Sequence, residues 1–162
     1  MLDSIGHSGL STFLLLALLV NLATQPRDAS GQIVMIVHSD YSQDDISVET
    51  VRRLYTGTIT RLPDGTRVIL TECAPVRAMF YRAVSNMTID EIRRRWLSII
   101  FSGAGGRPPT EFVDVEDLKR FVANTRGALG FMPWSEVDDR VKVLTVDGRA
   151  PGDPGYALDE SG

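Results

Sequence analysis

After residue 30, the pattern of apolar and polar positions predicts short buried strands that alternate with amphipathic helices. The stretch QIVMIVH, which begins at Gln32, is almost wholly apolar and rich in Ile and Val, and this predicts a strand buried on both faces. In ISVETVRRLYTG, apolar residues recur at helical spacing between Ser47, a favourable N-cap, and Gly57, a favourable stop. A Pro-Asp-Gly turn then leads into TRVIL, from Thr66 to Leu70, which predicts a second strand.

Three further helices and two strands are predicted downstream. Pro75 stands at the first position of one helix, where its missing N–H costs little. Thr88 opens the next helix with Glu91 three residues later, which is the spacing of a capping box. Asp114 caps the third, which ends at Gly127. The apolar stripe predicted to be buried on the second of these helices consists of Ile89, Ile92, Trp96, Ile99 and Ile100. The final strands are ALGFMP and VKVLTV.

Strands that alternate with helices predict an α/β fold, here a small, mostly parallel sheet flanked by helices. Residues 31–150 are expected to form one domain, followed by a Gly- and Pro-rich C-terminal tail at 151–162. Ligands of such folds bind beyond the carboxyl ends of the strands. Two loops follow predicted strands, HSDYSQDD and TECAPV. We therefore expect His38 and Ser39 to share one edge of the sheet with the segment around Cys73.

The first 30 residues differ from the rest. An apolar run from Phe13 to Val20 is too short to span a bilayer, which takes about 20 residues, but it suits the hydrophobic region of a signal peptide. No Lys or Arg precedes it. Residues 1–30 are therefore either a signal peptide, cleaved between Ala23 and Ser30, or a disordered N-terminal arm. A signal peptide implies a periplasmic or secreted protein with no stable membrane insertion after cleavage.

Composition excludes several functional classes. With a net charge of −4 and a pI of about 5.1, the chain is unsuited to non-specific binding of nucleic acid. One Cys and two His do not support a disulfide framework or a Cys/His metal site. The glycines of Gly103–Gly106 follow a predicted helix rather than a strand, so they do not indicate a dinucleotide site. We expect no metal, no cofactor and no nucleic-acid partner.

Four stretches occur in the order VETVRRLYTGTITRLPDGTRVIL, VRAMFYRAV, IFSGAGGRPP and TRGALGFM. Together they resemble the phosphate-type substrate-binding proteins of bacterial ABC transporters, in the periplasmic-binding-protein-like superfamily. The resemblance covers about Ile33 to Asp147. Full-length family members have two lobes that close on the ligand, whereas this chain is long enough for one. The resemblance therefore implies a single lobe of a type II periplasmic-binding-protein-like fold, with a non-catalytic function and weak binding of a small oxyanion such as phosphate.

The turn TECAPVR is the predicted anion site, because a strand that leads into a helix start leaves N–H groups unpaired. The family has glycine and a hydroxyl residue where Cys73 and Ala74 stand, and its Lys and Trp are replaced by Thr58 and Leu62. These departures remove side-chain donors. The anion-binding candidates are Cys73, Ala74, Val76 and Arg77 on this turn, with His38 and Ser39 on the other loop.

Two other functions compete with anion binding. The first is a protein–protein interaction module that has lost the anion site and that binds a protein partner, or a second copy that supplies the missing wall of the cleft. The second is a thiol enzyme in which Cys73 is the nucleophile and His38 its base. A small, half-buried residue in the place of a glycine explains Cys73 more simply, so we expect no enzyme.

Overall fold

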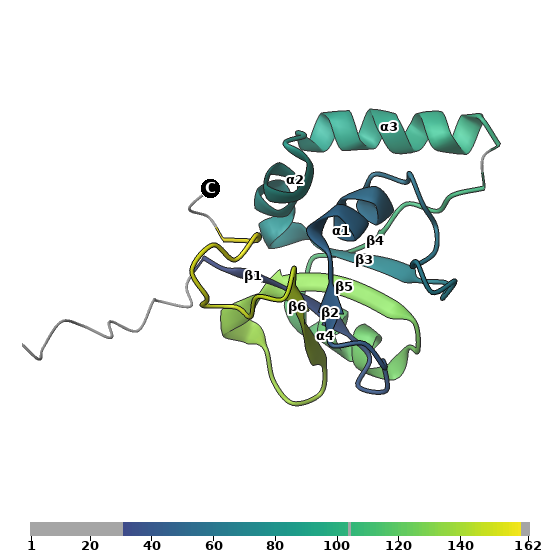
Figure 1. Cartoon of the computed structure of the whole chain (residues 1–162). Helices are drawn as coiled ribbons and strands as arrows, with labels where there is room; N and C mark the ends of the chain where they lie inside the picture. The colour runs from purple at the N-terminus through teal and green to yellow at the C-terminus, as the bar shows by residue number, and fades with distance from the viewer. Residues whose placement is uncertain (1–30, 104, 160–162) are drawn as a thin grey trace, which may run out of the picture.

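The structure, a computed structural model, describes residues 31–103 and 105–159. A six-stranded sheet in the order β2-β6-β1-β5-β3-β4 forms its centre (Figure 1). The strands are β1 (Ile33–Val37), β2 (Asp45–Ile46), β3 (Ile69–Cys73), β4 (Thr110–Phe112), β5 (Ala128–Pro133) and β6 (Lys142–Val146). The helices are α1 (Val48–Tyr55), α2 (Arg77–Ser85), α3 (Ile89–Phe101) and α4 (Val115–Asn124), with short 3-10 turns at Ala74–Val76 and Trp134–Glu136. The expectation for residues 1–30 lies outside the described residues.

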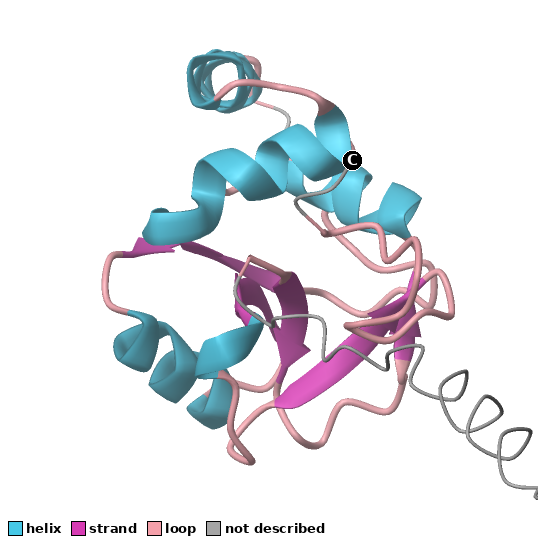
Figure 2. Cartoon of the chain, turned by 90° about the vertical axis from the view of Figure 1, so that its left-hand side faces the viewer, coloured by secondary structure: helices cyan, strands magenta, loops and turns pink. Residues whose placement is uncertain are grey.

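Helices flank both faces of this sheet, as the alternation of apolar stretches predicts. Helix α4 packs against β1, β3 and β5 on one face, while α1 and α2 lie on the other (Figure 2). Helix α3 forms an outer layer that contacts α2 (Figure 1). None of the helices among the described residues has the length and apolar character needed to cross a bilayer.

Three of the five strand pairings are parallel, which confirms the mostly parallel sheet. The exception is β1, which runs antiparallel to both β5 and β6. Since β3 is parallel to β5, β1 runs opposite to β3. The loops after β1 and β3 therefore lie at opposite ends of the sheet. The expectation that His38 and Ser39 share an edge with Cys73 is wrong, because it assumed that β1 and β3 point the same way.

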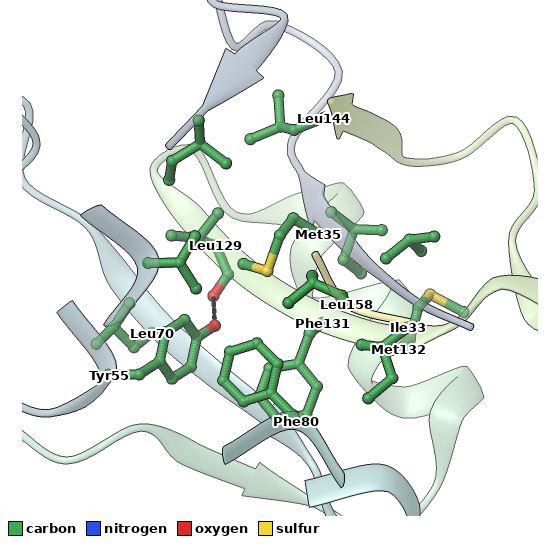
Figure 3. Packing of buried hydrophobic residues seen from close by; sticks show 14 of the residues in the cluster. Ile33, Met35, Tyr55, Leu70, Phe80, Leu129, Phe131, Met132, Leu144 and Leu158 are labelled. Carbon is green, nitrogen blue, oxygen red and sulfur yellow. Dashed lines mark hydrogen bonds between the residues drawn. The ribbon is translucent and has the colours of Figure 1, made fainter. Parts of the chain in front are cut away.

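The core is built around aromatic side chains from α1, α2 and β5 (Figure 3). Phe80 and Phe131 stack with their ring centroids 3.7 Å apart, and Tyr55 meets Phe80 edge-on at 4.8 Å. The Tyr55 hydroxyl shares its single proton in a bifurcated hydrogen bond with the carbonyl oxygens of Thr71 and Leu129, at 2.9 and 3.2 Å. Because Tyr55 is fully buried, these two bonds satisfy a group that would otherwise destabilise the core.

The predicted helix caps are present. Ser47 accepts a hydrogen bond from the Thr50 N–H, and Thr88 and Glu91 form the reciprocal bonds of a capping box. Asp114 accepts from the first-turn N–H groups of α4. The end of α3 differs from the prediction, because Ile100 is 48% exposed although its stripe was expected to be buried.

The C-terminal tail is part of the folded unit up to Leu158. Tyr156 and Leu158 are buried, and the Ile33 N–H at the start of β1 donates to the Leu158 carbonyl at 3.2 Å. The tail therefore packs against the same end of the sheet as the Cys73 turn, where β3 ends and β1 begins.

Candidate functional site

The predicted anion turn connects β3 to α2 through the 3-10 turn Ala74–Val76. Cys73 ends the strand and is fully buried, and Arg77 begins the helix. The Arg77 N–H donates to the Ala74 carbonyl. One of the two backbone donors predicted to hold an anion, the Arg77 N–H, is therefore engaged within the turn itself. Pro75 has no N–H, and Ala74 offers no side-chain donor.

The Arg77 guanidinium is also engaged. It contacts Glu72 Oε1 at 3.2 Å and pairs closely with the Glu111 carboxylate. The Tyr81 hydroxyl donates to the second oxygen of Glu72 at 2.8 Å. Two carboxylates thus share one guanidinium, which leaves an excess negative charge at the point where an oxyanion was expected.

The register of the sheet explains why Arg77 is bound in this way. Glu72 on β3 and Glu111 on β4 are direct cross-strand partners, so their side chains lie on the same face. Like charges in that position repel each other, and Glu72 is only 8% exposed. Arg77 and Tyr81 supply the donors that this buried carboxylate needs. Burial, together with the adjacent charge of Glu72, raises the pKa of Tyr81 well above its ordinary value, so Tyr81 is a permanent donor.

Sequence reasoning missed Glu72, Tyr81 and Glu111. Glu72 was expected in the loop, whereas it lies inside β3, and β4 was not predicted at all. Glu111 is 34 residues from Arg77, so no local pattern links them. The alternation of Thr71, Glu72 and Cys73 after an apolar strand was the only signal, since a carboxylate on a buried face requires a cationic partner.

His38 and Ser39 belong to a different part of the surface. The His38 Nδ1 accepts a hydrogen bond from the Asp40 N–H at 3.0 Å, and Ser39 is exposed. His38 lines a 220 Å³ hollow together with Tyr41 and Arg126, beside the start of β5. Neither residue contributes to the Cys73 turn.

The structure does not bring Cys73 and His38 together as the nucleophile and base that a thiol enzyme would require. The Cys73 side chain is buried, and this burial raises the pKa of its thiol. His38, at the opposite end of the sheet, cannot act as its base. Among residues 31–103 and 105–159, no three His, Cys, Asp or Glu side chains converge to hold a metal ion.

A 260 Å³ hollow adjoins the ion cluster, between α2, α3 and β4. Arg77, Glu72 and Glu111 lie at one end, and the apolar side chains of Ile92, Trp96 and other residues line the rest. Its charged groups already neutralise one another in part. The hollow is therefore suited to apolar groups rather than to a small, strongly hydrated anion.

No family profile and no curated protein matches the chain. Among solved structures, it is similar to a candidate phosphate ABC transporter substrate-binding protein with bound phosphate from Clostridium perfringens (TM-score 0.60, 20% identity, 75% of this chain and 47% of that one). It is also similar to an ABC-type phosphate transport receptor from Vibrio cholerae (TM-score 0.59, 15% identity, covering 75% and 48%). A third match is PstS from Borrelia burgdorferi (TM-score 0.54, 10% identity, covering 75% and 49%).

These similarities establish the fold. The chain spans about half the length of each of the three solved proteins. The resemblance inferred from four short stretches of sequence is thereby confirmed at the level of the fold, as one part of a periplasmic-binding-protein-like architecture. Phosphate is a ligand of the Clostridium perfringens protein.

Proposed function

We propose that this chain, which has the fold of one half of a phosphate-transport binding protein, is a non-catalytic module that binds a protein partner. The observation that carries this proposal is the position of Arg77 between Glu72 and Glu111. The only cationic side chain of the predicted anion turn is thereby used to stabilise the fold. We place the protein in the periplasm or outside the cell, on the strength of the apolar run at residues 13–20 and of the fold.

The energetics favour the loss of tight anion binding. Hydrogen bonds to a charged group contribute about 1.5–3 kcal/mol each. Micromolar affinity corresponds to about −8 kcal/mol, so the loss of two or three such bonds leaves millimolar affinity or weaker. Here the hydroxyl donor is replaced by Ala74, the Arg77 N–H is engaged by the Ala74 carbonyl, and the Arg77 guanidinium is shared by two carboxylates. An incoming oxyanion would have to displace one of them.

Exposed apolar side chains support a role in binding another macromolecule, and two of them, Leu97 and Ile100, line the hollow beside Arg77. Leu97, Ile100 and Phe101 on α3 are 46%, 48% and 85% exposed, and Val113 after β4 is 76% exposed. Clusters of large exposed apolar side chains are typical of interaction surfaces.

Isothermal titration of phosphate into the full chain tests the proposal. We expect no binding up to about 10 mM phosphate, well above the range of a nutrient-binding protein. Replacing Glu111 with Gln (Glu111→Gln) releases Arg77 from one carboxylate and should raise phosphate affinity, whereas Ala74→Ser alone should not. Micromolar binding by the unmodified chain, abolished by Arg77→Ala, would contradict the proposal.

Weak binding of an oxyanion is a second candidate function, favoured by the phosphate bound in the similar Clostridium perfringens structure. In that case a second copy of the chain could supply the missing wall of the cleft. The same titration, repeated at two protein concentrations, separates the candidates. Phosphate binding that strengthens with protein concentration, together with a dimer in sedimentation analysis, supports the second candidate.

A further inference from the structure

A second groove lies at the other end of β3 from the Cys73 turn. Its volume is 520 Å³, against 260 Å³ for the hollow beside Arg77. The chain from Arg67 to Leu70 and the segment from Gly105 to Thr110 line it, together with Trp96 of α3. We propose that this groove holds a short, extended, acidic stretch of the protein partner. The inference rests on the proposed function and assigns its binding surface.

The sheet has a gap along this wall. On the groove side, Arg67 is bridged to Arg61 and Thr71 is paired with Thr110 of β4. Residues 68–70 lie between these two pairings, and no strand of the part of the chain that the structure describes pairs with them on that side. This gap is about 10 Å long for three extended residues. A segment of about three residues in extended conformation would therefore fill it.

The backbone at the gap is oriented to receive such a segment. The Ile69 N–H donates to the Gly127 carbonyl at 2.8 Å, on the β5 side. Because successive backbone groups of a strand point in opposite directions, the Leu70 N–H and the Val68 carbonyl face the groove. Unpaired backbone groups at a sheet edge are templates for an added extended segment.

The charges on the groove select an acidic occupant. Arg67 and Arg107 both line it, and none of its other described lining residues is Asp or Glu. Within residues 31–103 and 105–159, neither guanidinium has an ion-pair partner, and both residues are exposed. The chain as a whole carries a net charge of −4, so this groove is a local positive site on an acidic protein. Such complementarity attracts acidic segments and disfavours basic ones.

The remaining lining favours a polypeptide over a free inorganic anion. Ile59, Val68, Ile69 and Pro108 contribute apolar surface between and beside the two arginines. Ile69 is 42% exposed, which is unusual for a strand residue in the interior of a sheet order. A segment that alternates acidic and aliphatic side chains can place carboxylates on Arg67 and Arg107 and bury its aliphatic side chains between them.

The test is an NMR titration of the isotope-labelled full chain with a blocked seven-residue peptide that alternates Val and Glu. We expect saturable amide shifts at residues 67–70 and 105–110, and none with the same peptide in which Lys replaces Glu. The double variant Arg67→Glu/Arg107→Glu should bind the acidic peptide at least about tenfold more weakly. Arg53→Glu, at an exposed position on α1, is the matched charge-reversal control and should bind normally.

Three results would overturn the groove assignment. The first is the absence of shifts at these residues up to about 5 mM acidic peptide. The second is an equal response to the Lys peptide. The third is saturation of the same amides by inorganic phosphate alone, or by self-association without peptide.

The groove and the proposed function can fail separately. If a partner isolated with the unmodified chain binds the Arg67→Glu/Arg107→Glu variant equally well, the interaction function stands and the groove assignment is wrong. If phosphate binds tightly at Arg77 while the acidic peptide still shifts the groove amides, the groove stands and the proposed function is wrong.

Discussion

Arg77 is the residue on which the interpretation of the Cys73 turn depends. A lone arginine at a helix start is a plausible ligand for an anion. In the folded chain it instead joins α2 to two strands, because Glu72 and Glu111 are cross-strand neighbours and need a shared cation. The Arg77 side chain therefore stabilises the folded chain.

Replacing Arg77 with Met tests this structural role. We expect a loss of about 2–3 kcal/mol in the free energy of unfolding, below the full cost of breaking a buried pair because Glu111 is 45% exposed. Urea denaturation measures the change. Adding Glu72→Gln should restore part of the loss, because it removes the uncompensated carboxylate. A change below about 0.5 kcal/mol for Arg77→Met, as for an ordinary surface residue, would contradict the role.

The buried Cys73 thiol should react slowly in the folded chain. The thiol is buried and its pKa is raised by that burial, so little thiolate forms and little reagent reaches it. We expect alkylation of the native chain near neutral pH to be at least about 100-fold slower than alkylation in urea. Mass spectrometry over a time course measures both rates. A native rate equal to that of a free thiol would show that the turn opens readily.

At the scale of single elements, α3 shows that a pattern and its environment can disagree. Ile92 and Trp96 are buried, and the Trp96 indole N–H donates to the Tyr55 carbonyl at 3.1 Å. One turn later, Ile100 and Phe101 are exposed, because the helix extends beyond the body of the molecule (Figure 1). The same apolar stripe is therefore partly core and partly surface.

The contact between β3 and β5 depends on a residue without a side chain. A Cβ on Gly130 would lie 2.3 Å from the Thr71 hydroxyl oxygen, which donates to the Leu129 carbonyl. Gly130→Ala should therefore destabilise the chain by about 2–3 kcal/mol, as overpacking does in a dense core. Thermal unfolding measures the loss. The double variant Gly130→Ala/Thr71→Ala removes the clashing oxygen and should be more stable than Gly130→Ala alone; otherwise another contact is responsible.

At the scale of the whole molecule, a charge cluster joins α4 to the loop before β6. Lys119, whose side chain is 6% exposed, contacts Glu116 at 3.1 Å and Asp138 at 2.8 Å. Arg140 pairs with both carboxylates as well. Hydrogen bonds from Arg140 and Lys119 lower the pKa of Glu116 to about 2. The same two side chains also lower the pKa of Asp138 well below its ordinary value.

This cluster predicts the pH dependence of stability. Because the folded-state pKa values are depressed, the cluster stabilises the fold fully above about pH 4.5, and the contribution is lost as the pH falls toward 2. The urea midpoint should therefore decline through that range. Glu116→Gln/Asp138→Asn should show a shallower decline, and so should the unmodified chain in 1 M salt, since exposed carboxylates are screened. Equal slopes for all three would exclude this cluster as the cause.

Strand direction is also decided at this scale, and it divides the predicted site residues. His38 and Cys73 each follow or end a buried strand, and both loops were expected at one edge. Antiparallel pairing of β1 with β5 places them at opposite ends instead. The positive groove at Arg67 and Arg107 arises in the same way, from segments about 40 residues apart that meet beside β3.

The features that could be predicted from the amino-acid sequence depend on contacts within about four residues along the chain. The Thr88–Glu91 capping box, the Ser47 and Asp114 caps and the buried strand at β1 were all predictable, because helix caps and apolar periodicity act locally. The direction of β1 and the partners of Arg77 follow instead from pairings between distant segments of the folded chain. Strand pairing joins residues such as Glu72 and Glu111 that are distant along the chain, and their shared burial, which no local pattern encodes, determines what Arg77 does.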